Sequence, residues 1–129
     1  MLKILRIKKT LEFQKISKNC DKFYSHTCLL LTRKTPEIYF QNLEKNKNLK
    51  DFCRVGFTVA KTVSKKAVER NLAKRRLRAT FDLFAPDLAK NHFDYIVIAR
   101  KEILTSDFTK ISGDLKFCLR KIHLNKFNK

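Results

Sequence analysis

The sequence predicts one α+β domain, with helices packed against a single four-stranded sheet. Two observations support this prediction. The chain has 129 residues, of which 43% are hydrophobic, and this suits one domain with a small core. Its hydrophobic patterns follow the order α-β-β-β-α-β-α, which is typical of helices gathered against one sheet. The domain is expected to span residues 1–129, with a basic arm at residues 1–9 and a basic tail at residues 126–129.

The first half of the chain is expected to contain a short helix and three strands. The arm carries four cations and is expected to be only partly ordered without a partner. Thr10 is predicted to cap a helix that runs to Lys18. The strands are predicted at residues 23–32, 37–41 and 51–61. The third has the period of a half-buried strand, in which Arg54, Gly56 and Thr58 alternate with Val55, Phe57 and Val59.

The second half is expected to contain a basic helix, a strand and a final helix. Ser64 is predicted to cap the basic helix, which covers residues 65–84 and is ended by Pro86. Residues 93–100 are strongly apolar, which indicates a strand in the interior of the sheet. The last predicted element is a helix whose cap is Thr105 or Ser106.

The positive charge of the basic helix falls mostly on one side. Arg70, Lys74 and Arg78 are spaced by one helical turn and form a ridge, with Asn71 and Arg75 beside it. Asp82 lies one turn beyond Arg78 and is expected to pair with it. Residues 61–78 contain eight cations and one acidic residue, the cations being Lys61, Lys65, Lys66, Arg70, Lys74, Arg75, Arg76 and Arg78.

Two apolar stripes flank the ridge, so the helix is expected to pack on the protein from two sides. The first stripe contains Val68, Leu72, Ala79 and Leu83. The second contains Ala73, Leu77, Phe81 and Phe84.

The charge indicates a polyanionic partner. The chain has 30 Lys plus Arg and 12 Asp plus Glu, a formal net charge of +18. Cations one turn apart repel, so the ridge weakens its helix until something outside neutralises it. Nucleic acid is the leading candidate, and a solvated surface face or an anionic membrane is the alternative. Neither a membrane span nor the apolar stretch of a signal peptide is found, so the cytoplasm is expected.

The chain shows no arrangement of residues for catalysis. The cysteines are Cys20, Cys28, Cys53 and Cys118, and the histidines are His26, His92 and His123. Their spacing fits no metal-ligand set, and reduced, largely buried thiols are expected. No carboxylate pair or triad is recognisable. These patterns predict a binding protein without catalytic residues, a metal site or a small-molecule substrate.

One motif is more specific than the composition. Residues 54–61 read RVGFTVAK and residues 67–78 read AVERNLAKRRLR. Together they resemble the signature of the bacterial ribonuclease P protein family, in which a strand ending in lysine precedes Ala-Val-x-Arg-Asn-x-x-Lys-Arg-x-x-Arg on a helix. The element order and the segment DYIVIARK resemble the family too. The chain departs from the pattern at Thr62, Leu72 and Ala79, where the family often has lysine, arginine and glutamate.

The resemblance implies a left-handed β-α-β crossover around the basic helix and a role in ribonuclease P. In that enzyme a large RNA performs Mg²⁺-dependent removal of the 5′ leader of precursor tRNA, and the small basic protein assists. The partners would then be the catalytic RNA and precursor tRNA, with Mg²⁺ bound mainly by the RNA. The RNA contacts that the resemblance implies are Arg54, Lys61, Lys65, Lys66, Arg70, Asn71, Lys74, Arg75 and Arg78.

The family also holds the leader in a cleft between the first helix and the sheet. Phe13 falls at the family's aromatic position in that helix, so it either stacks on the leader or belongs to the core. Two other family aromatics correspond to Ser17 and Leu31 here.

Two other classes of function stay open. A ribosomal or ribosome-associated RNA-binding protein would explain the charge without the motif. An independent nuclease would need acidic metal ligands, which the sequence does not show.

Overall fold

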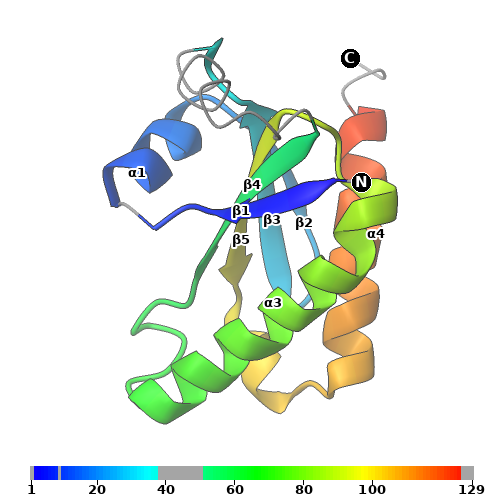
Figure 1. The fold of residues 1–129 in the computed structure, drawn as a ribbon. Helices are drawn as coiled ribbons and strands as arrows, with labels where there is room; N and C mark the ends of the chain where they lie inside the picture. Colours follow the sequence, from blue (N-terminus) through cyan, green and yellow to red (C-terminus); the bar gives the residue numbers. More distant parts are fainter. Residues whose placement is uncertain (1, 9, 38–50, 126–129) are drawn as a thin grey trace.

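The chain forms a five-stranded sheet with helices on both faces (Figure 1). The computed structural model describes residues 2–8, 10–37 and 51–125. Its elements are β1 (Lys3–Arg6), α1 (Thr10–Lys18), β2 (Asp21–Tyr24), β3 (Cys28–Lys34), β4 (Phe52–Thr58), α3 (Ala67–Leu88), β5 (Phe93–Ala99), the 3-10 helix η1 (Lys101–Thr105) and α4 (Phe108–Asn125). The strand order is β1-β4-β5-β3-β2. The predicted α+β class is confirmed, with five strands in place of four.

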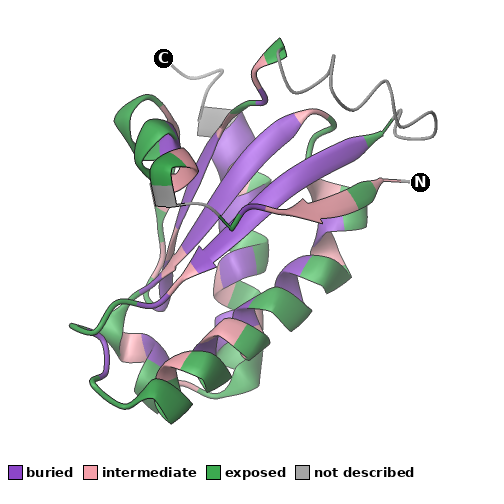
Figure 2. Ribbon diagram, turned by 60° about the vertical axis from the view of Figure 1, so that its left-hand side comes forward, coloured by how far each residue is buried: buried purple, intermediate pink, exposed green. Residues whose placement is uncertain are grey.

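Helices α3 and α4 cover one face of the sheet, and α1 covers part of the other (Figure 1). The main core lies beneath α3 and α4 and includes Leu77, Tyr95 and Leu115. A smaller core lies beneath α1 and includes Ile16 and Ile96. Figure 2 shows the result: β4 and β5 are buried along most of their length, while α3 alternates buried and exposed positions.

The basic arm contains the edge strand β1. Lys3–Arg6 pairs in parallel with β4, with Arg6 opposite Val55. The N–H of Ile7 extends the ladder by donating to the Val55 carbonyl at 2.8 Å. Within the arm, pairing with β4 fixes the backbone of residues 3–7, and Ile4 packs against the main core.

The strand predicted at residues 23–32 is two strands. β2 and β3 are antiparallel, and Ser25 closes the turn between them. The Ser25 hydroxyl donates to the Cys28 carbonyl at 2.6 Å, and its N–H donates to the same carbonyl at 2.9 Å. This local bonding interrupts a run of strand-forming residues. The strand predicted at residues 37–41 lies outside the described residues except for Glu37, which is helical.

The start of α3 differs from the prediction. The helix begins at Ala67, and Ser64 is not its N-cap. The Ser64 hydroxyl accepts a hydrogen bond from the N–H of Lys66 at 3.1 Å and donates to the Glu69 carboxylate. Ser64 therefore stabilises the loop that leads into the helix.

The end of α3 lies beyond Pro86, which does not terminate the helix as predicted. Proline removes the N–H that would bond to the carbonyl four residues earlier, but Pro86 lies in the last turn, so little of the helix follows it. The N–H of Ala89 still donates to the Ala85 carbonyl at 2.9 Å. The helix then leads into β5, which is parallel to β4. The left hand of this crossover stays a prediction.

Asp107 caps α4, in place of the predicted Thr105 or Ser106. Its carboxylate accepts a hydrogen bond from the N–H of Lys110 at 2.8 Å, which is N-cap geometry. Thr105 instead ends η1, and Ser106 follows it. Across the described ranges, none of the helices combines the length and apolar character needed to cross a bilayer.

Strand β4 is buried on both faces, although the alternation of apolar with other residues along it predicts burial on one face only. Arg54 and Gly56 lie on the face that α1 covers, and both are buried. A Cβ added at Gly56 would lie 2.5 Å from the Phe13 ring and 3.2 Å from the Ile7 carbonyl. Helix α1 can approach β4 this closely because residue 56 has no side chain.

Gly56→Ala is expected to destabilise the protein by about 1–3 kcal/mol, because the new methyl group must displace the Phe13 ring. Urea unfolding followed by circular dichroism measures the change. Gly113→Ala is the control, since a Cβ there meets nothing within 4 Å and alanine favours helix α4 by about 1 kcal/mol. Equal stability of the Gly56→Ala variant and the parent would show that Phe13 does not rest on β4.

Candidate nucleic-acid interface

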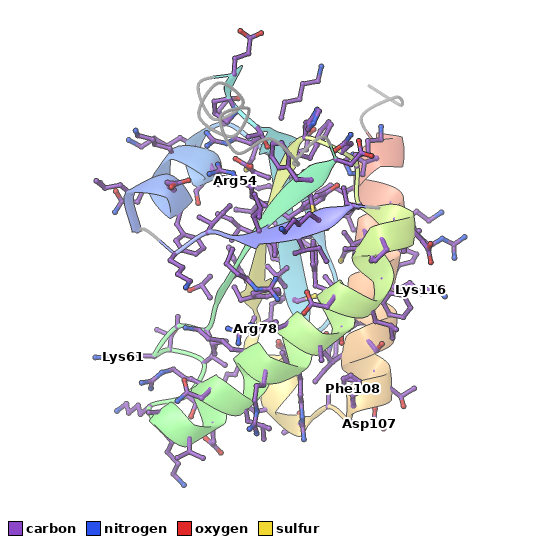
Figure 3. The ribbon with its side chains drawn as sticks, in the orientation of Figure 1. Arg54, Lys61, Arg78, Asp107, Phe108 and Lys116 are labelled. Carbon is purple, nitrogen blue, oxygen red and sulfur yellow. The ribbon has the colours of Figure 1, made fainter. Side chains whose placement is uncertain are left out.

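The predicted RNA-binding residues other than Arg54 line one side of α3 and the loop before it. The exposed ones on the loop and at the helix start are Lys61, Lys65 and Lys66, and those on the helix are Asn71, Arg75 and Arg78. Arg70 and Lys74 are half-buried between them. Figure 3 shows Lys61 on the loop and Arg78 on the helix, both beside the gap between α1 and α3.

Over the residues that the structure describes, the ridge of Arg70, Lys74 and Arg78 is not paired with an internal carboxylate. Arg70 Nη1 donates to the carbonyl of Ser64 at 2.9 Å, which orients that side chain without neutralising it. The predicted pair of Arg78 with Asp82 is wrong, because Asp82 bonds to Arg6. The ridge therefore keeps its positive charge for an external anion.

A groove of about 400 Å³ opens where β1 ends, between α1 and α3. The Phe57 ring lies beneath two arginines: the Cζ atoms of Arg6 and Arg78 are 5.5 and 6.0 Å from its centroid. Such cation–π contacts position guanidinium groups without using their N–H donors. The residues that line the groove are Arg6, Ile7, Lys8, Phe13, Val55, Gly56, Phe57, Lys74 and Arg78.

Phe13 lies in this groove, and it is also part of the packing. Its ring is half-buried, packs against the smaller core and rests on Gly56. The same groove contains Lys74 and Arg78 from the ridge. The structure thus brings the predicted leader-binding aromatic of α1 together with two predicted RNA-binding cations of α3, although the two helices lie far apart in the sequence.

Arg54 lies in the interior and not at this surface, so the prediction that it contacts RNA is wrong. Its side chain is 7% exposed and bonds to Asp94, which is fully buried. The Nε and Nη2 atoms donate to the two Asp94 carboxylate oxygens at 2.7 and 2.6 Å, while Nη1 donates to Glu12 at 2.8 Å. Arg33 and Thr35 also donate to Asp94. Arg54 therefore fastens α1 to the sheet, beside the groove.

The groove residues that the sequence patterns do not indicate include Arg6, Lys8 and Phe57. Arg6 and Lys8 belong to the segment that the sequence predicts to be a partly ordered arm, which gives them no fixed position. Their signal is the alternation of residues 5–8, in which the apolar residues at 5 and 7 alternate with the cations at 6 and 8. Phe57 has the pattern of a strand-core residue, and it is indeed only 8% exposed.

One of the two apolar stripes of α3 is exposed, so the prediction of packing on two sides is wrong. Ala73, Leu77 and Phe81 are buried against the sheet and α4, whereas Val68 is 80% and Leu83 64% exposed. That side of the helix is therefore open over the described residues. A second hollow, of about 450 Å³, follows this side, and it is lined by Val68, Asn71, Leu72, Lys74, Arg75 and Arg78.

The cysteines belong to the interior. Cys28, Cys53 and Cys118 are buried, and Cys20 is half-buried. Burial raises the pKa of Cys53 to about 12, which keeps that thiol protonated at neutral pH. Over the described part of the chain, no three His, Cys, Asp or Glu side chains gather closely enough to hold a metal ion.

The fold and this surface together define a class: a small basic α+β protein with cations along one side of a long helix and a groove beside it. Comparison with known proteins gives the family. The family model described as Ribonuclease P matches residues 1–123. The chain therefore belongs to the ribonuclease P protein family. Membership makes the chain a component of an endoribonuclease complex that has an RNA partner.

Individual relatives agree with the family. The chain is 43% identical over 74 residues to the ribonuclease P protein component of Ruegeria pomeroyi, a match covering 57% of this chain and 58% of that protein. It is 32% identical over 122 residues to the component of Thermoanaerobacter sp. (strain X514), covering 95% of this chain and 92% of that protein. The solved RNase P protein from Thermotoga maritima has a TM-score of 0.71 at 26% identity, covering 91% of this chain and 96% of that one.

Proposed function

We propose that the chain is the protein subunit of ribonuclease P and assists Mg²⁺-dependent removal of the 5′ leader from precursor tRNA. The ridge of α3 and the lysines before it bind the catalytic RNA. The groove binds the single-stranded leader. The observation that carries this proposal is the convergence of Phe13, Lys74 and Arg78 on one groove at the edge of an unneutralised cationic helix.

The protein's contribution is electrostatic and positional. Its cations neutralise phosphates that would otherwise repel one another where the leader meets the catalytic RNA. Phe13 supplies a ring on which a leader base stacks. The described residues offer no cluster of carboxylates for a metal ion, so Mg²⁺ is assigned to the RNA, where lower phosphate repulsion favours its binding.

Reconstitution tests this function. The chain is mixed with the ribonuclease P RNA of its own source, and cleavage of precursor tRNA is followed over a range of Mg²⁺ concentrations. The protein is expected to lower the Mg²⁺ concentration needed for cleavage at the leader junction. Failure to do so would refute the proposal, and cleavage by the protein without RNA would favour an independent nuclease.

Phe13→Leu is expected to weaken binding of precursor tRNA to the assembled complex by roughly fivefold or more, because stacking on an aromatic ring is worth about 1–3 kcal/mol per base. Leucine keeps an apolar contact near Gly56 but has no ring. Mature tRNA, which has no leader, should bind as before. Leu11→Ala is the control, since Leu11 is an exposed side chain of the same helix. Equal loss for both tRNAs would assign Phe13 to the core alone.

A further inference from the structure

Arg6, which lines the groove, forms an ion pair with Asp82 beside it, and the proposed function does not use this pair. Both Asp82 carboxylate oxygens accept from the same nitrogen, Nη2 of Arg6, at 2.9 and 3.0 Å. The two side chains are 30% and 44% exposed, so water and salt screen the pair. An external anion can therefore compete with Asp82 at little cost to the fold.

The pair leaves part of Arg6 unsatisfied. Nη1 of Arg6 is buried without a hydrogen-bond partner, and it is the one side-chain nitrogen or oxygen of this kind in the described ranges. Arginine binds carboxylate or phosphate best when two of its nitrogens donate to two oxygens in parallel. Asp82 uses a single nitrogen. An anion that reached both Nη atoms would remove the cost of the unpaired donor.

Arg78 lies close to the same position. Arg6 and Arg78 approach the ring of Phe57 together, at 5.5 and 6.0 Å from its centroid, so two positive charges share one ring. Asp82 lies one turn beyond Arg78 on α3 yet bonds to Arg6, which lines both the groove and the neighbouring hollow that contains Asp82. A phosphate has enough oxygens to accept from two arginines at once, which a carboxylate held by α3 does not do here.

We propose that a phosphate of single-stranded RNA in the groove displaces Asp82 from Arg6 and is bound by Arg6 and Arg78 together. Asp82 is then an internal competitor. It lowers the affinity of the groove for phosphates that are not placed to contact both arginines. This inference rests on the proposed function and adds two residues to it: Arg6 binds the RNA backbone, and Asp82 sets how selectively it does so.

Asp82→Asn tests the proposal, since it removes the competing charge and keeps the side-chain shape. Asp87→Asn is the matched control, because it removes the same charge from an exposed position on the same helix. The probe is a fluorescein-labelled single-stranded RNA bound to the protein alone. Asp82→Asn is expected to bind about fivefold more tightly than Asp87→Asn. Its salt dependence should be steeper by roughly 0.7, the slope of one further phosphate contact.

Arg6→Gln on the Asp82→Asn background should abolish this gain. Equal affinity of Asp82→Asn and Asp87→Asn for the RNA would overturn the proposal. Weaker binding by Asp82→Asn together with a lower Tm would also overturn it, because the Arg6–Asp82 pair would then serve the stability of the fold.

Cleavage of precursor tRNA separates failure of this proposal from failure of the proposed function. If the parent chain stimulates cleavage while the two asparagine variants bind RNA alike, the role of Asp82 fails and the function stands. If the parent does not stimulate, the function fails, and the binding comparison still decides the role of Asp82.

Discussion

Replacing Arg70, Lys74 and Arg78 together with alanine is expected to weaken binding of the ribonuclease P RNA roughly a hundredfold at physiological salt. The three cations form an unneutralised ridge, and each phosphate that the protein no longer neutralises lowers the slope of log K against log salt by about 0.7 to 0.9. The fold should persist, because alanine favours helix and the change removes two repulsive pairs, each worth a few tenths of a kcal/mol. Filter binding over a salt series and circular dichroism measure both effects.

The control for this variant removes the same charge from another helix. Lys116, Arg120 and Lys121 lie on α4, on exposed or half-buried positions away from the groove. Replacing these three with alanine should reduce RNA affinity much less, since only long-range attraction is removed. If the two triple variants show the same loss of affinity, net charge alone explains binding and the ridge has no special role. Unfolding of the ridge variant would instead make the ridge structural.

Arg54→Ala is expected to destabilise the protein by about 3–5 kcal/mol, the usual cost of leaving a buried charge without its partner. Asp94 is fully buried and receives two of its bonds from Arg54. Glu12 would lose its bond as well, which releases α1 from β4. Urea unfolding measures the stability, and the loosened α1 should also weaken binding of precursor tRNA more than of mature tRNA.

A double variant separates the charge from the packing. Arg54→Met combined with Asp94→Leu replaces the buried pair with apolar side chains of similar size, and such replacements are often close to neutral. The double variant is expected to recover much of the stability that Arg54→Ala removes. Stability within about 1 kcal/mol of the parent for Arg54→Ala itself would mean that water reaches Asp94 and that the network does not hold α1.

The parts of the interface that could be predicted are those decided within one element. The ridge follows from three cations spaced one turn apart, and this spacing needs no knowledge of the rest of the fold. The positions of β4, α3 and β5 follow from periodicity and from the motif around Asn71. The resemblance places Phe13 near the groove, and the structure adds why it fits there, because Gly56 makes room for its ring.

The parts that could not be predicted depend on partners far along the chain. Arg54 alternates with apolar residues like a solvent-facing cation, and its role depends on Asp94 and Glu12, which are 40 and 42 residues away. Asp82 prefers Arg6, 76 residues away, to Arg78 in its own helix. Whether Val68 packs or stays exposed is decided by where α4 and the sheet lie, and no pattern within α3 contains that information.

Crosslinking tests the location of the interface most directly. A photoreactive amino acid is placed at Arg75, on the open side of α3, or at Lys116, on α4 (Figure 3), and the complex with the ribonuclease P RNA is irradiated. We expect strong crosslinks to RNA from position 75 and few from position 116. Crosslinks mainly from position 116, with position 75 silent, would contradict the assignment of the RNA surface to α3 and its groove.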